Sequence, residues 1–117
     1  MDEMAVLQRA RGFLLGLDLS NVRTDLSVYL SAVNAKLRKE ELDDGESGIT
    51  LTRPDGRHII TVNALESEER QRFTICHEIA HIVLELPSQH EEVSASSFVK
   101  RDINEIYCDT FAAELLM

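Results

Sequence analysis

The chain has 117 residues, of which 44% are hydrophobic and 28% charged, the composition of an ordinary globular domain. This length suffices for one domain with a core, and the composition excludes a disordered chain, a collagen-like repeat and a coiled coil. The net charge of −9 disfavours nucleic-acid binding, because phosphate groups would be repelled. Residues 1–39 nevertheless carry a small positive excess, so the acidity belongs to residues 40–117. We expect a single domain over residues 1–117.

No segment resembles a secretion signal or a membrane span. The longest early apolar run is only Phe13 to Leu17, and charged residues precede it. Two cysteines, Cys76 and Cys108, are too few for the disulfide framework of a small secreted protein. These features predict a cytoplasmic protein that does not enter a membrane and whose two thiols are buried and inert.

The N-terminal part is predicted to be helical. Apolar residues at helical spacing predict an amphipathic helix over residues 2–17. A second, short helix is expected to follow, with Thr24 or Asp25 as its N-cap. Residues 35–39 lose the helical period and are predicted to form a strand, and residues 43–48 form an acidic loop.

A hairpin and two helices are expected after this loop. Two runs rich in β-branched residues, 49–52 and 58–62, flank a Pro-Asp-Gly turn and predict a β-hairpin. The strand at 58–62 is either a candidate edge to which an extended substrate could add by backbone pairing or an ordinary buried strand. Ser67 is expected to cap a long, largely buried helix that ends at Pro87. A polar loop and a final helix from about Asp102 complete the chain.

The long helix contains the motif H-E-x-x-H, formed by His77, Glu78 and His81. Histidines four residues apart project from one helix face, so both imidazoles can bind one tetrahedral metal ion. The glutamate beside them is placed to contact a water on that ion. A metzincin is excluded, because Leu84 and Pro87 stand where that class has Gly and His. The alternative interpretation is two core histidines beside an exposed glutamate.

A catalytic zinc needs a third protein ligand. Glu85 would lie about 9 Å along the helix axis from the histidines, too far to bind comfortably. His90, in the polar loop, is more typical of a surface residue. Glu105 on the final helix is the better candidate, with a capping box together with Asp102 as its alternative role. Asp109, one turn later, could orient a ligand histidine, or it could be an exposed helix position.

The residues around these motifs resemble the ImmA/IrrE family of zinc metallopeptidases. The resemblance rests on R-F-T at residues 72–74, the H-E-x-x-H motif, and E-x-x-C-D-x-F-A-A-E-L-L-M at residues 105–117. It covers roughly residues 24–117. It implies an α+β, minimal zincin-like core with amphipathic N-terminal helices, a small antiparallel or mixed sheet with a hairpin, and the H-E-x-x-H helix packed on a C-terminal ligand helix.

The resemblance also implies a site and a function. His77, His81 and Glu105 would bind zinc, Glu78 would be the catalytic acid/base that activates water, and Asp109 would support a ligand. The implied activity is that of an endopeptidase of narrow specificity that cleaves a helix-turn-helix repressor. A basic, DNA-binding partner of this kind would be attracted to the acidic part of the chain.

Three questions stay open at this point. The chain ends at Met117, where the family pattern usually continues, so we expect a domain truncated at its C-terminus. A metal-containing module that sequesters a regulatory protein without cutting it is one alternative, and a structural zinc domain with a fourth protein ligand is another. The group that stabilises the oxyanion is not identified among His90, Arg101 and Tyr107.

Overall fold

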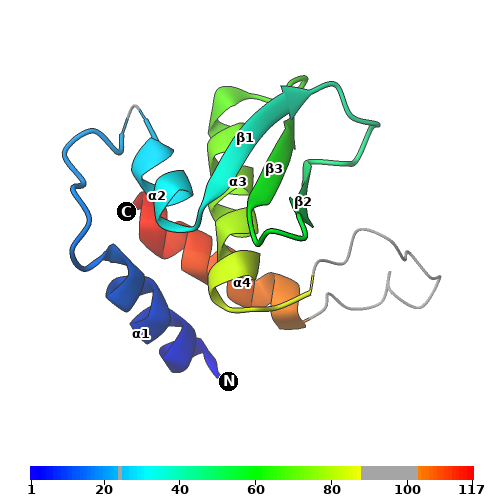
Figure 1. The fold of residues 1–117 in the computed structure, drawn as a ribbon. Helices are drawn as coiled ribbons and strands as arrows, with labels where there is room; N and C mark the ends of the chain where they lie inside the picture. Colours follow the sequence, from blue (N-terminus) through cyan, green and yellow to red (C-terminus); the bar gives the residue numbers. More distant parts are fainter. Residues whose placement is uncertain (24, 88–102) are drawn as a thin grey trace.

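The computed structural model describes residues 1–23, 25–87 and 103–117. It contains four helices and three strands: α1 (Glu3–Leu14), α2 (Ser27–Ala32), β1 (Ala35–Glu40), β2 (Gly48–Thr52), β3 (His58–Asn63), α3 (Glu68–Val83) and α4 (Ile103–Leu116). The expected α+β class with a small mixed sheet is confirmed (Figure 1). None of these helices has the length and apolar character needed to cross a membrane.

The sheet has the strand order β1-β3-β2, with β1 parallel and β2 antiparallel to β3. The predicted hairpin is confirmed, and its turn needs Gly56, whose φ of +89° favours glycine. Residues 58–62 could have formed either an edge strand or a buried strand; the structure shows the buried one, because β3 is the central strand and its last four residues are buried. Within the part of the chain that the structure describes, β1 and β2 are the two edge strands.

The two N-terminal helices differ in how they begin. Asp2 caps α1 by accepting a hydrogen bond from the Ala5 amide at 2.9 Å. The N-cap of α2 is Leu26, which has no side-chain capping bond; Asp25 instead accepts from the Ser27 amide at 2.8 Å. Thr24, the other predicted cap, lies outside the described residues. α1 ends at Leu14, three residues earlier than predicted, because the backbone turns extended at the next residue.

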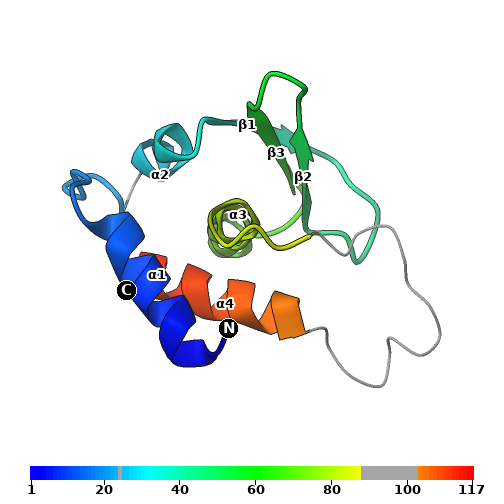
Figure 2. The same ribbon diagram turned by 60° about the horizontal axis from the view of Figure 1, so that its bottom comes forward.

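α3 is the central element of the molecule. Figure 2 looks along it and shows the sheet on one side and α4 with α1 on the other. The predicted Ser67 cap is confirmed, since its hydroxyl accepts from the Arg70 amide at 3.1 Å. The helix ends at Val83, before Pro87, because Glu85 adopts a φ of +54° and closes the last turn.

The last helix, α4, packs along α3 and α1 (Figure 2). The buried Tyr29 hydroxyl donates a 2.8 Å hydrogen bond to the Leu115 carbonyl and so fastens α2 to the end of α4. The expected start near Asp102, and the polar loop predicted before it, lie outside the described residues. The core is mainly aliphatic and draws on all layers; its fully buried members include Val6, Ile60, Val62, Ile79, Ala80, Phe111 and Ala112.

Candidate metal centre

The two histidines of the H-E-x-x-H motif lie one turn apart on α3 and meet at their outer nitrogens. Nε2 of His77 is 3.3 Å from Nε2 of His81. The side chains are 12% and 3% exposed respectively, so the pair is nearly withdrawn from solvent. The helical pitch alone brings residues i and i+4 onto one face. This local geometry directs two Nε2 atoms, both possible metal ligands, toward the same point beside α3.

Glu105 reaches the same place from α4. Its Oε1 lies 3.2 Å from Nε2 of His77, and its Oε2 lies 2.9 Å from Nε2 of His81. The carboxylate therefore spans both imidazoles and does not turn back to its own helix, as the capping-box alternative required. Packing of α4 against α3 brings these groups together across an interval of twenty-four residues.

The Nδ1 atom of each histidine ring lies within hydrogen-bond distance of an oxygen acceptor. Nδ1 of His77 lies 2.7 Å from Oδ1 of Asp109, and Nδ1 of His81 lies 3.0 Å from the Leu86 carbonyl oxygen. A carbonyl can only accept, so Nδ1 of His81 carries the proton, and its Nε2 keeps a lone pair in the neutral ring. Asp109, expected to orient a histidine, is thus placed against His77.

The closing turn of α3 supplies this second acceptor. The Glu85 amide donates to the Ile82 carbonyl at 3.3 Å, and the Leu86 amide donates to the His81 carbonyl at 3.0 Å. This pair of bonds is the Schellman pattern, with Glu85 as the left-handed residue. The motif that ends the helix therefore folds the Leu86 carbonyl back onto the His81 ring.

The donor set fits a zinc ion. Two ligands bound to tetrahedral zinc at 2.0–2.1 Å lie about 3.3 to 3.4 Å apart, close to the separations among His77, His81 and Glu105. Oε2 of Glu105 is also buried and accepts no hydrogen bond of good geometry from the described residues, although His81 is near. Two imidazoles and one carboxylate form a common ligand set of catalytic zinc.

The electrostatics keep the carboxylate ionised. Burial by itself raises the pKa of Glu105, but the contacts with His77 and His81 and their charge outweigh it and hold that pKa well below its usual value. Burial lowers the pKa of His81, yet the contacts with Cys108 and Glu105 and the charge of Glu78 raise it above its usual value. Without a metal, these groups form a tightly coupled ion pair.

Glu78 is 1% exposed and is held from the sheet side. The Thr50 hydroxyl, on the edge strand β2, donates a 2.7 Å hydrogen bond to Oε1 of Glu78. The sequence reasoning missed Thr50, and no local pattern could have identified it, because the contact joins residues twenty-eight positions apart. The hydrogen bond restricts how the buried carboxylate can rotate.

Cys108 lies closer to this cluster than expected. Its sulfur and the ring nitrogens of His77 and His81 lie within 4.8 Å of one another. A signal for this position existed, since Cys108 follows Glu105 by three residues and shares its helix face. Cys76 has no place in the cluster; burial raises the pKa of its thiol to about 12, with Arg72 opposing the shift.

The remaining candidates are not brought to the histidines. Glu85 is exposed and lies after the end of α3. The Tyr107 hydroxyl donates a 2.7 Å hydrogen bond to the Met1 carbonyl, which directs it toward the N-terminus. His90 and Arg101 lie outside the described residues, so the proposals for their roles stay predictions.

A cavity of about 640 Å³ adjoins the cluster between the sheet and the end of α3. It touches both His81 and Thr50, the residue that holds Glu78. Its complete lining is Thr50, Thr52, His58, His81, Ile82, Glu85, Leu86 and Pro87. The lining therefore mixes polar side chains from the sheet and from α3 with apolar side chains at the end of α3.

Comparison with known proteins agrees with this geometry. The model of a peptidase family, described as the IrrE N-terminal-like domain, matches residues 28–117. The radiation response metalloprotease IrrE of Deinococcus deserti is 36% identical over 88 aligned positions, which cover 62% of this chain and 31% of that protein. The chain thus spans less than a third of this relative's length. Because the match includes the H-E-x-x-H helix and the Glu105 helix, the chain belongs to the IrrE N-terminal-like peptidase family.

Proposed function

We propose that this domain is a zinc-dependent endopeptidase of narrow specificity. One observation carries the proposal: the Glu105 carboxylate spans the outer nitrogens of His77 and His81, with the buried carboxylate of Glu78 on the same helix. His77, His81 and Glu105 would hold the metal. When bound, zinc supplies Lewis-acid polarisation of the peptide carbonyl and lowers the pKa of water.

The chain's own residues account for the proton transfers. Glu78 takes a proton from the attacking water, whose oxygen adds to the carbonyl carbon of the peptide bond. The carbon–nitrogen bond then breaks, and Glu78 passes the proton to the departing amine. The Thr50 hydroxyl fixes one oxygen of Glu78 during both transfers. Asp109 keeps the His77 ring oriented through the 2.7 Å contact with Nδ1.

The surroundings of the site suit an extended protein segment. Among the described residues β2 pairs with β3 alone, so its other edge can hydrogen-bond to a substrate backbone, and the 640 Å³ cavity lies beside it. A basic helix-turn-helix repressor fits the net charge of −9. We infer a role in a cytoplasmic stress response, in line with the name of the Deinococcus relative.

The test is incubation of the zinc-loaded chain with a candidate helix-turn-helix repressor from the same organism, followed by mass analysis of the fragments. Glu78→Gln should retain zinc and lower the cleavage rate by about 10²- to 10⁴-fold. Equal cleavage by Glu78→Gln would overturn the assignment of the base. A stable complex without fragments, with zinc bound, would instead support a module that sequesters its partner.

Cys108 supports a second candidate, a closed structural zinc site. Its sulfur lies within 4.8 Å of the histidine nitrogens and could provide a fourth protein ligand. In a closed site, Cys108→Ser should sharply weaken zinc binding and abolish thiolate-to-metal absorption after cobalt substitution. In the proposed catalytic site, zinc affinity should hardly change and the cobalt form should lack that absorption.

A further inference from the structure

A second cavity, of about 400 Å³, lies between α2, β1 and the N-terminal half of α3. Arg72 and Ile75 line it from α3. Ile75 and His77 are two residues apart, and a helix turns by about 200° over that step, so they face opposite directions. The cavity is therefore separate from the metal centre and from the cavity beside it.

The floor of this cavity is apolar. Leu26, Leu30 and Ile75 are buried core residues, and Leu37 packs against them from β1. Side chains alternate along a strand, so Leu37 and Lys39 share one face of β1, while Lys36 and Arg38 share the other. A ligand in the cavity would thus contact aliphatic groups below and a lysine at the rim.

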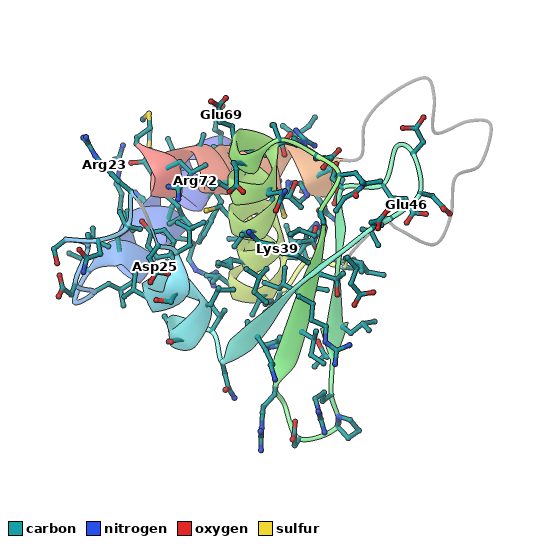
Figure 3. The ribbon with its side chains drawn as sticks, turned by 90° about the horizontal axis from the view of Figure 1, so that it is seen from above. Arg23, Asp25, Lys39, Glu46, Glu69 and Arg72 are labelled. Carbon is teal, nitrogen blue, oxygen red and sulfur yellow. The ribbon has the colours of Figure 1, made fainter. Side chains whose placement is uncertain are left out.

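Three cations line the cavity. Arg23, Lys39 and Arg72 come from the segment before α2, from β1 and from α3; Figure 3 shows Arg72 and Lys39 beside α3 and Arg23 farther out. Within residues 1–23, 25–87 and 103–117 none of the three forms an ion pair. Arg72 is half-buried and donates one bond, at 3.1 Å, to the Val22 carbonyl, which leaves further N–H groups available. A partly buried guanidinium without a carboxylate favours an anion nearby.

Two carboxylates also line the cavity, but both serve the ends of helices. Asp25 accepts from the Ser27 amide at the start of α2, at 2.8 Å. Glu68 lies in the first turn of α3, where the helix dipole favours an anion. The cations still outnumber them, in a protein whose net charge is −9. The cavity is a local exception to the acidity of the chain.

We propose that this cavity binds a small amphipathic anion, in which a carboxylate or phosphate group is joined to an apolar chain or ring. The arginine guanidinium pairs with either group through two parallel hydrogen bonds. The volume lies in the range of small-molecule pockets, which combine an apolar lining with a few converging polar groups. The binding is independent of the proposed peptidase activity.

The test is a titration of the full 117-residue chain, followed by amide chemical shifts in NMR. The probes are octyl phosphate and octanoate, both below their micelle concentrations, with inorganic phosphate and octylammonium as comparisons. Comparing octyl phosphate with octanoate distinguishes a phosphate ligand from a carboxylate ligand. We expect saturable binding of at least one amphipathic anion, with the largest shifts at Leu26, Leu37 and Ile75 and little change at His77 and His81.

Substitutions test which cationic side chains contact the ligand. Lys39→Gln and Arg23→Gln should each weaken this binding on the order of tenfold, because each removes a charged hydrogen-bond donor. Arg38→Gln is the matched control: it removes the same charge from the other face of β1 and should leave the affinity unchanged. All three side chains are exposed, so these variants should fold.

The proposal would be overturned by any of three results. One is the absence of saturable shifts with both octyl compounds. Another is equal weakening by Arg38→Gln, which would indicate general charge attraction. The third is equal binding of octylammonium or of inorganic phosphate, which would remove the need for the anion or for the apolar floor.

Discussion

Two faces of α3 differ in how their charged side chains are paired. One face meets α4, and the other meets α2 and β1. Toward α4, His77 and His81 find Glu105 and Asp109 at 2.7 to 3.2 Å. Toward α2, the half-buried Arg72 donates to a backbone carbonyl, and no carboxylate in the described part of the chain forms an ion pair with it. A charge in a partly buried place is costly unless it is paired. One face therefore supplies its own partners, arranged as a metal would require them, and the other favours a partner from solution.

The largest expected effect is on the metal face. His81→Ala removes a ligand that is nearly buried, and we expect zinc content to fall from about one ion per chain to none. Elemental analysis after dialysis measures this, with circular dichroism to verify the fold. His58→Ala is the control, because His58 lines the neighbouring cavity but is not part of the cluster. Retention of stoichiometric zinc by His81→Ala would contradict the site.

Asp109 tests whether the paired arrangement itself matters. Asp109→Ala removes the acceptor that holds Nδ1 of His77, and we expect zinc affinity to fall by about 10- to 100-fold. A competition titration against a chelator measures the change. Glu114→Gln, on the same helix but paired with Arg11, should leave the affinity unchanged. An unaltered affinity in Asp109→Ala would show that packing alone orients the ring.

Thr50 tests the sheet side of the same site. Thr50→Val keeps the shape but removes the hydrogen bond to Glu78, and we expect kcat to fall about tenfold, with KM and zinc content little changed. Thr50→Ser should restore most of the rate because it returns the hydroxyl. Steady-state kinetics on a cleaved repressor peptide separate kcat from KM. A rise in KM with kcat unchanged would assign Thr50 to substrate binding instead.

The last prediction concerns stability and leaves the metal centre unchanged: it concerns Cys76, which follows Arg72 by one turn. Burial raises the pKa of this thiol to about 12, so between about pH 9 and 12 the unfolded chain loses a proton that the folded chain keeps. The free energy of unfolding should therefore fall as pH rises through this window, by about 1.4 kcal/mol per pH unit for this group. Cys76→Ala should remove that part of the slope in urea unfolding. Identical slopes would contradict burial of the thiol.

Local sequence patterns predicted most of the helices and strands and the two histidines of the site. The spacing of His77 and His81 is a property of any helix, and the Ser67 cap and the Gly56 turn depend on neighbouring residues alone. The place of Thr50 beside Glu78 could not be predicted, because it depends on which strand forms the edge next to α3. For the same reason, the sequence left open whether residues 58–62 form an edge strand or a buried strand.

By itself, the sequence determined the α+β composition, the buried helix with two histidines on one face, and a resemblance that named Glu105. Only the tertiary structure decided that Glu105 faces the histidines and not its own helix end, that Cys108 joins the cluster, and that Arg72 borders a separate cavity. The physical reason is the sequence distance over which each kind of interaction acts. Helical pitch and turn geometry act over a few residues, whereas these contacts depend on how α4, α2 and the sheet pack around α3.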